Sequence, residues 1–196
     1  MTAVDRLLTA AIHELGQTEQ PPGSNVQKYS AWMGRPPEPW CDDFISYVAH
    51  QAGLSDVIWP SSYVPNRLAA ARAQNLVDRR PAVGALACFD WNGDGTADHI
   101  GIVEAVNADG TITTIEGNTS PDDHGSQSNG GGVYRRRRDV RYVTGFIHPK
   151  YQEADVPLTD EDVQRIAEAT MSQVWGAAWP TGRVDPTGKR EMVRAD

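Results

Sequence analysis

The chain has 196 residues, a formal net charge of −8 at pH 7 and two cysteines. A chain of this length can bury a core without disulfides, and two cysteines do not make a disulfide framework. The acidic balance argues against a nucleic-acid-binding protein, which needs a basic surface. No apolar run approaches the length that crosses a bilayer. These properties indicate one globular domain with a short appendage.

Helical periodicity dominates the first part of the chain. Apolar stripes predict helices over residues 4–15 and 41–52, and an Ala-rich segment predicts a short helix over 64–74. The period then changes to that of β-strands, whose runs are broken by Gly, Asn or Asp. Helices followed by strands indicate an α+β fold in which the second helix packs on an antiparallel sheet. The expected strands span residues 83–89, 100–106, 111–116, 133–138 and 142–147.

Cys41 lies at the start of the second helix, directly after Pro39 and Trp40. Unpaired N–H groups and the positive end of the helix dipole favour an anion there, which for a cysteine is the nucleophilic thiolate. The adjacent Asp42 and Asp43 oppose thiolate formation by their like charge. A plain core cysteine is an equally good interpretation from position alone, since free cysteine is often buried.

The hairpin formed by the second and third expected strands supplies a partner for the thiol. Its turn is rich in Asn, Asp and Gly, and we expect Val106 to pair with Thr111 across it. Period-two alternation then places His99, Glu116 and Asn118 on one face, with Asn118 opposite the imidazole and Glu116 on the diagonal. A base beside an orienting group is the pattern of nucleophilic catalysis. A histidine at a strand start is otherwise an ordinary surface residue.

These groups predict acyl transfer from an amide through a thioester, in the residue order of papain-like enzymes. Cys41 supplies the sulfur, His99 takes its proton and later protonates the leaving amine, and Glu116 holds the far N–H of the imidazole. Asn118 either orients the imidazole or polarises the substrate carbonyl. Backbone N–H groups at the start of the second helix are the expected oxyanion donors. A second histidine in place of Glu116 is disfavoured, because no other histidine falls on this face.

Three segments together resemble the CHAP family of cysteine, histidine-dependent amidohydrolases and peptidases. They are Pro-Trp-Cys-Asp-Asp-Phe-Ile-Ser at 39–46, Ala-Asp-His-Ile-Gly-Ile-Val at 97–103 and Ile-Glu-Gly-Asn at 115–118. The loop at 19–29 is similar to the entrance segment of members from phage lysins. The resemblance covers residues 1–150.

The resemblance implies a papain-like α+β fold that cuts peptidoglycan, either at the amide joining muramic acid to L-alanine or within the peptide stem or cross-bridge. Residue by residue, it implies Cys41 as nucleophile, His99 as base, Glu116 as orienter and Asn118 as an additional polar residue. The sequence does not choose between amidase and endopeptidase.

Aromatic residues lie on the approach to the candidate nucleophile. Asn25, Tyr29 and Trp40 are the candidate substrate contacts, because rings beside a reactive thiol can line a substrate groove. The alternative is that the rings simply cover the first helix.

Residues 90–98 reproduce the first nine positions of an EF-hand calcium loop. The twelfth position, which should be a bidentate glutamate, is Gly101. The alternative is an Asx- and Gly-rich connection between strands. We expect calcium to bind here and to position His99, although the chemistry itself needs no cofactor. The expected ligands are Asp90, Asn92, Asp94, Thr96 and Asp98.

Two further features are interpreted as structural. Residues 135–138 are four arginines on an expected strand, and we interpret them as solvated charge on an edge strand. Cys88 is expected to fill the core.

The composition changes beyond residue 151, which predicts a catalytic domain over 1–150 and an appendage over 151–196. Thr159 is the expected N-cap of an amphipathic helix, and a tail rich in Pro, Gly and charge follows it. We expect this helix to pack on one of three surfaces: the catalytic domain, a second copy of the chain or a phage partner.

No charged-then-apolar signal segment opens the sequence. We therefore expect synthesis in the host cytoplasm and action on the cell wall, after holin-type release or as part of a virion. The predicted function is a bacteriolytic peptidoglycan amide hydrolase, either an endolysin or a tail-associated lysin. The alternative from another class is a non-catalytic wall-binding or phage tail structural protein that retains the fold.

Overall fold

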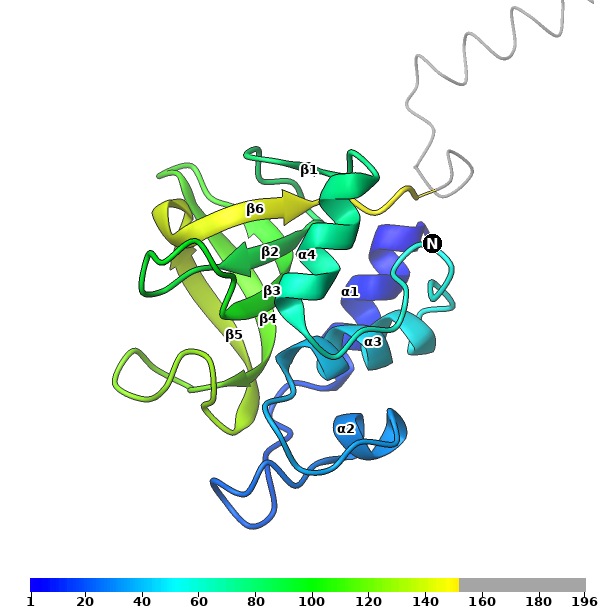
Figure 1. Cartoon of the computed structure of the whole chain (residues 1–196). Coiled ribbons are helices and arrows are strands. Elements are labelled where there is room, and N and C mark those ends of the chain that lie inside the picture. The colour runs from blue at the N-terminus through cyan, green and yellow to red at the C-terminus, as the bar shows by residue number, and fades with distance from the viewer. Residues whose placement is uncertain (152–196) are drawn as a thin grey trace, which may run out of the picture. The chain divides into compact units, whose positions relative to one another are not determined.

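The structure, a computed structural model, describes residues 1–151 (Figure 1). The helix predicted after Thr159 and the tail that follows lie outside the described residues, and the boundary at residue 150 stays a prediction. Within the described part, no helix is long and apolar enough to cross a membrane. The helices are α1 (Ala3–His13), α2 (Lys28–Trp32), α3 (Cys41–Gln51) and α4 (Val64–Ala73). The strands are β1 (Val77–Asp78), β2 (Leu86–Phe89), β3 (His99–Val106), β4 (Thr111–Thr119), β5 (Gly132–Asp139) and β6 (Val143–Ile147), with a 3-10 turn at Val140–Tyr142.

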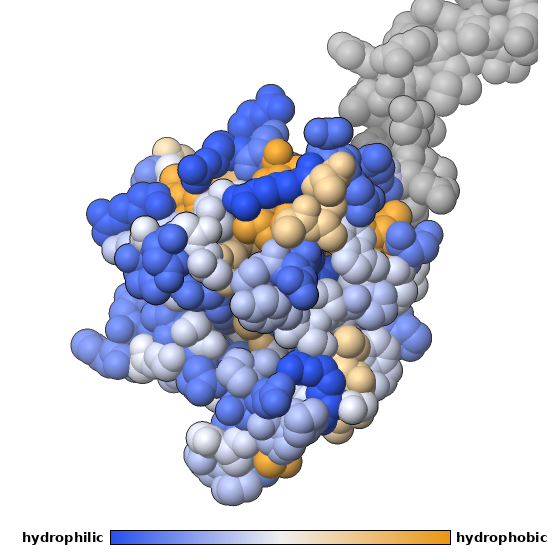
Figure 2. Space-filling model, in the orientation of Figure 1, coloured by the Kyte–Doolittle hydropathy of each residue, from blue (hydrophilic) through white to orange (hydrophobic). Residues whose placement is uncertain are grey.

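The strands form one antiparallel sheet in the order β1-β6-β2-β3-β4-β5. Helices α1, α3 and α4 pack against it, and Figure 1 shows them on one side of the sheet. This confirms the predicted α+β architecture. The sequence analysis misses only the short elements α2 and β1, which are too brief to show a period. The surface seen in Figure 2 is mainly hydrophilic, with scattered apolar areas.

Apolar side chains fill both faces of the sheet. On the helix side, Ile100, Ile102 and Ile115 are fully buried in one cluster with the apolar residues of α3. On the other side, Val103 and Ile112 belong to a smaller cluster built on β2 and β6. Successive side chains of β3 therefore point alternately toward the helices and toward the opposite face of the sheet. His99 lies on the opposite face, as Val103 does.

The hairpin between β3 and β4 has two registers. Near the turn, Val106 pairs with Ile112 instead of the predicted Thr111. A bulge further along β3 shifts the pairing by one residue, and beyond it Ile102 pairs with Ile115. The end of the hairpin that carries the candidate site residues therefore has the predicted register, although the turn does not.

Helix α3 approaches β4 closely at Gly117. A Cβ atom on this glycine would lie 2.5 Å from Cβ of Phe44 and 2.8 Å from Cζ3 of Trp40. Any side chain would push the helix away from the strand. The glycine thus sets how near Cys41, the first residue of α3, comes to the sheet.

Replacing Gly117 by alanine is expected to destabilise the protein by about 1–3 kcal/mol, because the methyl group overpacks the contact between α3 and β4. Urea denaturation of the variant and the parent measures the change in unfolding free energy. An unchanged denaturation midpoint would show that α3 can move away from β4 without cost.

Candidate active site

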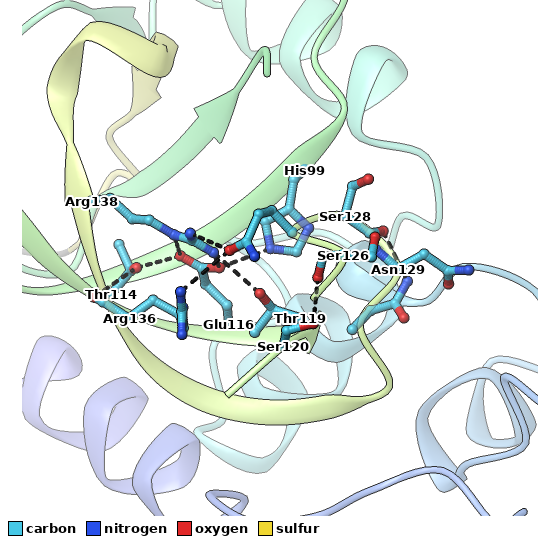
Figure 3. A network of polar contacts seen from close by, with 12 residues as sticks. His99, Thr114, Glu116, Thr119, Ser120, Ser126, Ser128, Asn129, Arg136 and Arg138 are labelled. Atoms are coloured by element: carbon cyan, nitrogen blue, oxygen red, sulfur yellow. Dashed lines mark hydrogen bonds and ion pairs between the residues drawn. The ribbon is translucent and has the colours of Figure 1, made fainter. Parts of the chain in front are cut away.

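His99 and Glu116 form a buried pair between β3 and β4 (Figure 3). The distance from His99 Nε2 to Glu116 Oε2 is 3.0 Å, and both side chains have 0% of their surface exposed. Gly101 makes room for the carboxylate, since a Cβ atom there would lie 2.6 Å from Cγ of Glu116. The structure thus brings together the predicted base and its predicted orienter.

The Glu116 carboxylate is fully occupied. Its Oε1 accepts hydrogen bonds from Thr114 Oγ1 at 2.5 Å and Arg138 Nε at 2.8 Å, and its Oε2 accepts from Arg138 Nη2 at 2.5 Å. Together with His99, these donors fill the lone-pair sites of an ionised carboxylate. Burial by itself raises the pKa of the Glu116 carboxyl. The hydrogen bonds from Arg138 and His99 outweigh burial and lower this pKa to about 2, from an ordinary value of 4.5.

An anionic Glu116 fixes the tautomer of His99. Because the carboxylate can only accept, the proton of the neutral imidazole must lie on Nε2. The ring lone pair is then on Nδ1, a buried atom that has no hydrogen-bond partner among residues 1–151. An unoccupied lone pair is what a general base needs.

Cys41 is the first residue of α3, and 7% of its surface is exposed. It lines a cavity of about 250 Å³ together with Asp98, the residue before His99. The backbone of Ile100, the residue after His99, interacts with the thiol. The sulfur therefore lies at the end of β3 that carries the imidazole.

The surroundings of Cys41 raise the pKa of its thiol. Burial raises the pKa of this thiol, and the carboxylates of Asp42 and Asp43 raise it further, while the backbone N–H groups of Asp42 and Ile100 oppose the rise. Burial and the two carboxylates thus act against the preference of a helix start for an anion, as the like charge of Asp42 and Asp43 indicates in the sequence.

Both acidic residues after Cys41 have cationic partners. Asp42 Oδ1 accepts from Arg67 Nε at 2.5 Å, and both of these side chains are buried. Asp43 Oδ2 accepts from Arg35 Nη1 at 2.8 Å. The pairs explain how two carboxylates can be buried beside a thiol, since an unpaired buried charge is costly.

Asn118 is buried at the end of β4 with φ of 59°, a left-handed conformation that Asn tolerates. Its Nδ2 donates to the carbonyl of Ser128 at 3.3 Å, and its Oδ1 has no partner within the described part of the chain. The imidazole N–H faces Glu116, so the carboxylate rather than the amide orients His99. A role of Asn118 toward the substrate carbonyl stays a prediction.

Of the predicted substrate contacts, Trp40 directly precedes Cys41 and Tyr29 packs on Trp40. The rings of Tyr29 and Trp40 are buried and stack with centroids 5.1 Å apart, and Trp40 Nε1 donates to Glu19 Oε1 at 2.9 Å. Both rings border a cavity of about 280 Å³. Their burial favours the alternative that they pack in the core, and substrate contact by them or by the half-buried Asn25 stays a prediction.

The loop over residues 90–98 is held by its own N–H groups. The carboxylate of Asp90 accepts from the N–H of Gly93 at 2.7 Å, and that of Asp94 accepts from the N–H of Thr96 at 2.8 Å. Over the whole described region, no group of three or more Asp, Glu, His or Cys side chains is arranged to hold a metal ion. Calcium binding by the loop stays a prediction.

The sequence analysis misses Arg138. Alternation along β5 does send the four arginines to opposite faces, but Arg136 and Arg138 are buried, while the side chains of Arg135 and Arg137 are exposed and pair with surface carboxylates. The interpretation of the whole run as solvated charge is therefore wrong for two of its members. The alternation itself could have found them, because the face of β5 that carries Arg138 adjoins the face of β4 that carries Glu116.

A helix with a cysteine at its start, packed on an antiparallel sheet that carries a histidine and its carboxylate partner, is the papain-like α+β fold. Residues 32–118 match the sequence model of the CHAP domain. This segment contains both Cys41 and the His99–Glu116 pair. No curated protein sequence matches the chain.

Three solved structures are similar to the chain at low identity. The endolysin LysIME-EF1 has a TM-score of 0.50 and 16% identity, over 90% of this chain and 88% of that one. The N-acetylmuramoyl-L-alanine amidase from Staphylococcus aureus has a TM-score of 0.41 and 21% identity, over 58% of this chain and 31% of the amidase, so the match spans about a third of that protein. The structure titled Ly7917 has a TM-score of 0.43 and 15% identity, over 74% of this chain and 62% of that one. At these identities the likeness to LysIME-EF1 supports the fold alone.

Glu116→Gln is expected to flatten the dependence of stability on pH in acid. A carboxyl whose pKa is lowered by folding stabilises the protein above its ordinary pKa of 4.5, and this contribution is lost as pH falls toward its folded pKa of about 2. Urea denaturation at about pH 5 and about pH 3 should therefore show a smaller loss of unfolding free energy in the variant than in the parent. Equal losses would mean that Glu116 is not held as an anion.

Proposed function

We propose that the chain is a cysteine-dependent peptidoglycan hydrolase that cleaves an amide bond through a thioester acyl-enzyme. The observation that carries the proposal is the arrangement of His99, whose Nε2 is held by Glu116 while Nδ1 has no partner among the described residues, at the end of β3 where the Cys41 thiol lies. Nucleophilic catalysis requires an oriented base within reach of the thiol, and the position of both groups at this end of β3 supports the proposal.

The first half of the reaction forms the acyl-enzyme. His99 Nδ1 takes the thiol proton while Cys41 Sγ attacks the amide carbon, and the electrons of the C=O bond move to its oxygen. When the tetrahedral intermediate collapses, the C–N bond breaks and His99 gives its proton to the leaving amine. In the second half, water attacks the thioester, His99 takes a proton from this water and returns it to the sulfur as the C–S bond breaks. Glu116 stabilises the imidazolium in both halves.

The raised pKa of the Cys41 thiol makes proton transfer part of the attack. A sulfur that is neutral at rest gains nucleophilicity only when the base removes its proton, so the mechanism is general-base catalysis rather than attack by a preformed thiolate. The backbone N–H groups in the first turn of α3 are the proposed oxyanion donors, since no side chain of the described residues caps this helix.

The match of residues 32–118 to the CHAP domain model supports the proposed substrate class. We propose that the bond is an amide of peptidoglycan and that the protein acts on the cell wall as an endolysin or a tail-associated lysin. The acidic chain and the mainly hydrophilic face seen in Figure 2 suit a protein that works on a hydrated polymer.

Replacing Cys41 by alanine is expected to reduce dye release from purified, labelled cell walls to the level seen without protein, because no other group can form the thioester. Cys88→Ala is the matched control, since Cys88 is fully buried in the helix-side core. Unchanged release by the Cys41 variant would end the enzyme proposal. Wall binding without release by the parent would favour the non-catalytic alternative. Mass spectrometry of the digested walls identifies the bond and separates amidase from endopeptidase.

The hypothesis that calcium binds the 90–98 loop has a direct test, although no step above depends on the ion. The oxygens of Asp90, Asn92 and Asp94 that accept loop N–H groups keep further lone pairs for a metal ion, so calorimetric titration of metal-free protein is expected to show calcium heat. Asp94→Ala should remove that heat. A titration without heat, with wall release unaffected by chelator, would exclude the site.

A further inference from the structure

We propose that Arg138 is a positioning residue of this site: its guanidinium clamps the Glu116 carboxylate in the one orientation that holds the His99 proton on Nε2. The proposal deepens the function proposed above and rests on it for the role of His99. It gives a role to one member of the run of four arginines, whose sequence pattern indicates solvated charge.

The geometry of the clamp is bidentate. The Nε and Nη2 atoms of Arg138 donate to separate oxygens of Glu116, at 2.8 and 2.5 Å, and the Arg138 side chain is 5% exposed. Two further donors are also used, since Nη2 donates to Thr119 Oγ1 at 3.1 Å and Nη1 donates to Gln127 Oε1 at 2.6 Å. Figure 3 shows the carboxylate between the guanidinium and the imidazole. A planar fork held at both ends fixes the plane of the carboxylate as well as its position.

The clamp decides which of two hydrogen-bond patterns the pair adopts. A buried carboxyl without a cation favours its protonated form, and a protonated Glu116 could donate to His99 Nε2. The imidazole proton would then move to Nδ1, where it would block the acceptance of the thiol proton. The guanidinium excludes this pattern because both oxygens already accept from it.

The charged groups around Glu116 come from two strands. His99 faces it from β3 and Arg138 faces it from β5, while Thr114 on its own strand supplies a neutral donor. The other buried arginine of β5, Arg136, is paired with Asp123 in the loop before β5. Arg138 is therefore the cation that compensates the buried carboxylate.

Aromatic rings cover the pair. The guanidinium of Arg138 lies 4.8 Å from the ring centroid of Trp91 and 5.8 Å from that of Phe89, and these two rings stack 4.7 Å apart. The Trp91 ring centroid is also 6.3 Å from that of His99. The rings limit the access of water, which strengthens the electrostatic interactions beneath them.

The test follows the alkylation of Cys41 by iodoacetamide as a function of pH, read by peptide-resolved mass spectrometry so that Cys88 is distinguished. Arg138→Ala should slow alkylation about tenfold to a hundredfold at neutral pH, the usual effect of a lost charge-assisted hydrogen bond, and should move the acid limb of the profile to higher pH. Arg138→Lys keeps the charge but not the bidentate geometry, so its alkylation rate should lie between those of Arg138→Ala and the parent. Arg137→Ala removes the exposed neighbour and should change the rate less than twofold.

Two further measurements separate positioning from general stability. Arg138 borders a cavity of about 580 Å³, so millimolar methylguanidinium can reach the space left by Arg138→Ala and should restore alkylation in that variant alone. In a Glu116→Gln background, Arg138→Ala should cost less than threefold, because the clamp then has no carboxylate to hold.

An unchanged or faster rate in folded Arg138→Ala would overturn the proposal, and so would full additivity with Glu116→Gln. If Arg138→Ala does not fold, the proposal is tested with Arg138→Lys instead. An alkylation pH profile of Arg138→Lys equal to that of the parent would show that the bidentate guanidinium is not required. If the alkylation profiles behave as expected while the parent releases no wall fragments, the proposed function fails and the role of Arg138 stands.

Discussion

The buried carboxylate of Glu116 is the charge on which the site depends. It lies in the sheet with no exposed surface, where an isolated anion would be strongly unfavourable. Donors from β3, β4 and β5 compensate it, so three strands must be in register before any one of these bonds is complete. The pair of His99 and Glu116 is thus a property of the assembled sheet and not of a single motif.

The second constraint is the distance between α3 and the sheet. Gly117 lets Phe44 approach β4, and the pairing of Asp42 with Arg67 allows the start of the helix to be buried with its acidic residues. The same burial raises the pKa of the Cys41 thiol. Close packing therefore places the sulfur near the sheet and disfavours its charged form, so the proposed mechanism needs a base that removes the proton during the attack.

The sequence predicts the fold class because helical and strand periods occupy separate parts of the chain. It also predicts the pairing of His99 with Glu116, because the site end of the β3–β4 hairpin alternates regularly. It fails at the turn, where a bulge absorbs one residue and no local pattern marks it. It fails for Arg138, whose partner lies on the neighbouring strand, and it leaves open the pKa of the Cys41 thiol, which depends on burial by elements distant in sequence. Interactions between residues close in sequence can be predicted from the sequence, whereas burial and contacts with neighbouring strands cannot.

The four consecutive arginines of β5 have a consequence for assembly of the sheet. If β5 slipped by two residues during folding, one guanidinium would simply replace another on the inner face, and the error would carry little electrostatic penalty. The correct alignment must then be enforced at the ends of the strand. Gly132 lies at one end, where a Cβ atom would come within 2.3 Å of the ring of Tyr134, and at the other end Asp139 accepts the N–H of Arg141 at 2.9 Å as the chain turns. In a strand with such a repetitive sequence, the residues at its two ends set the register.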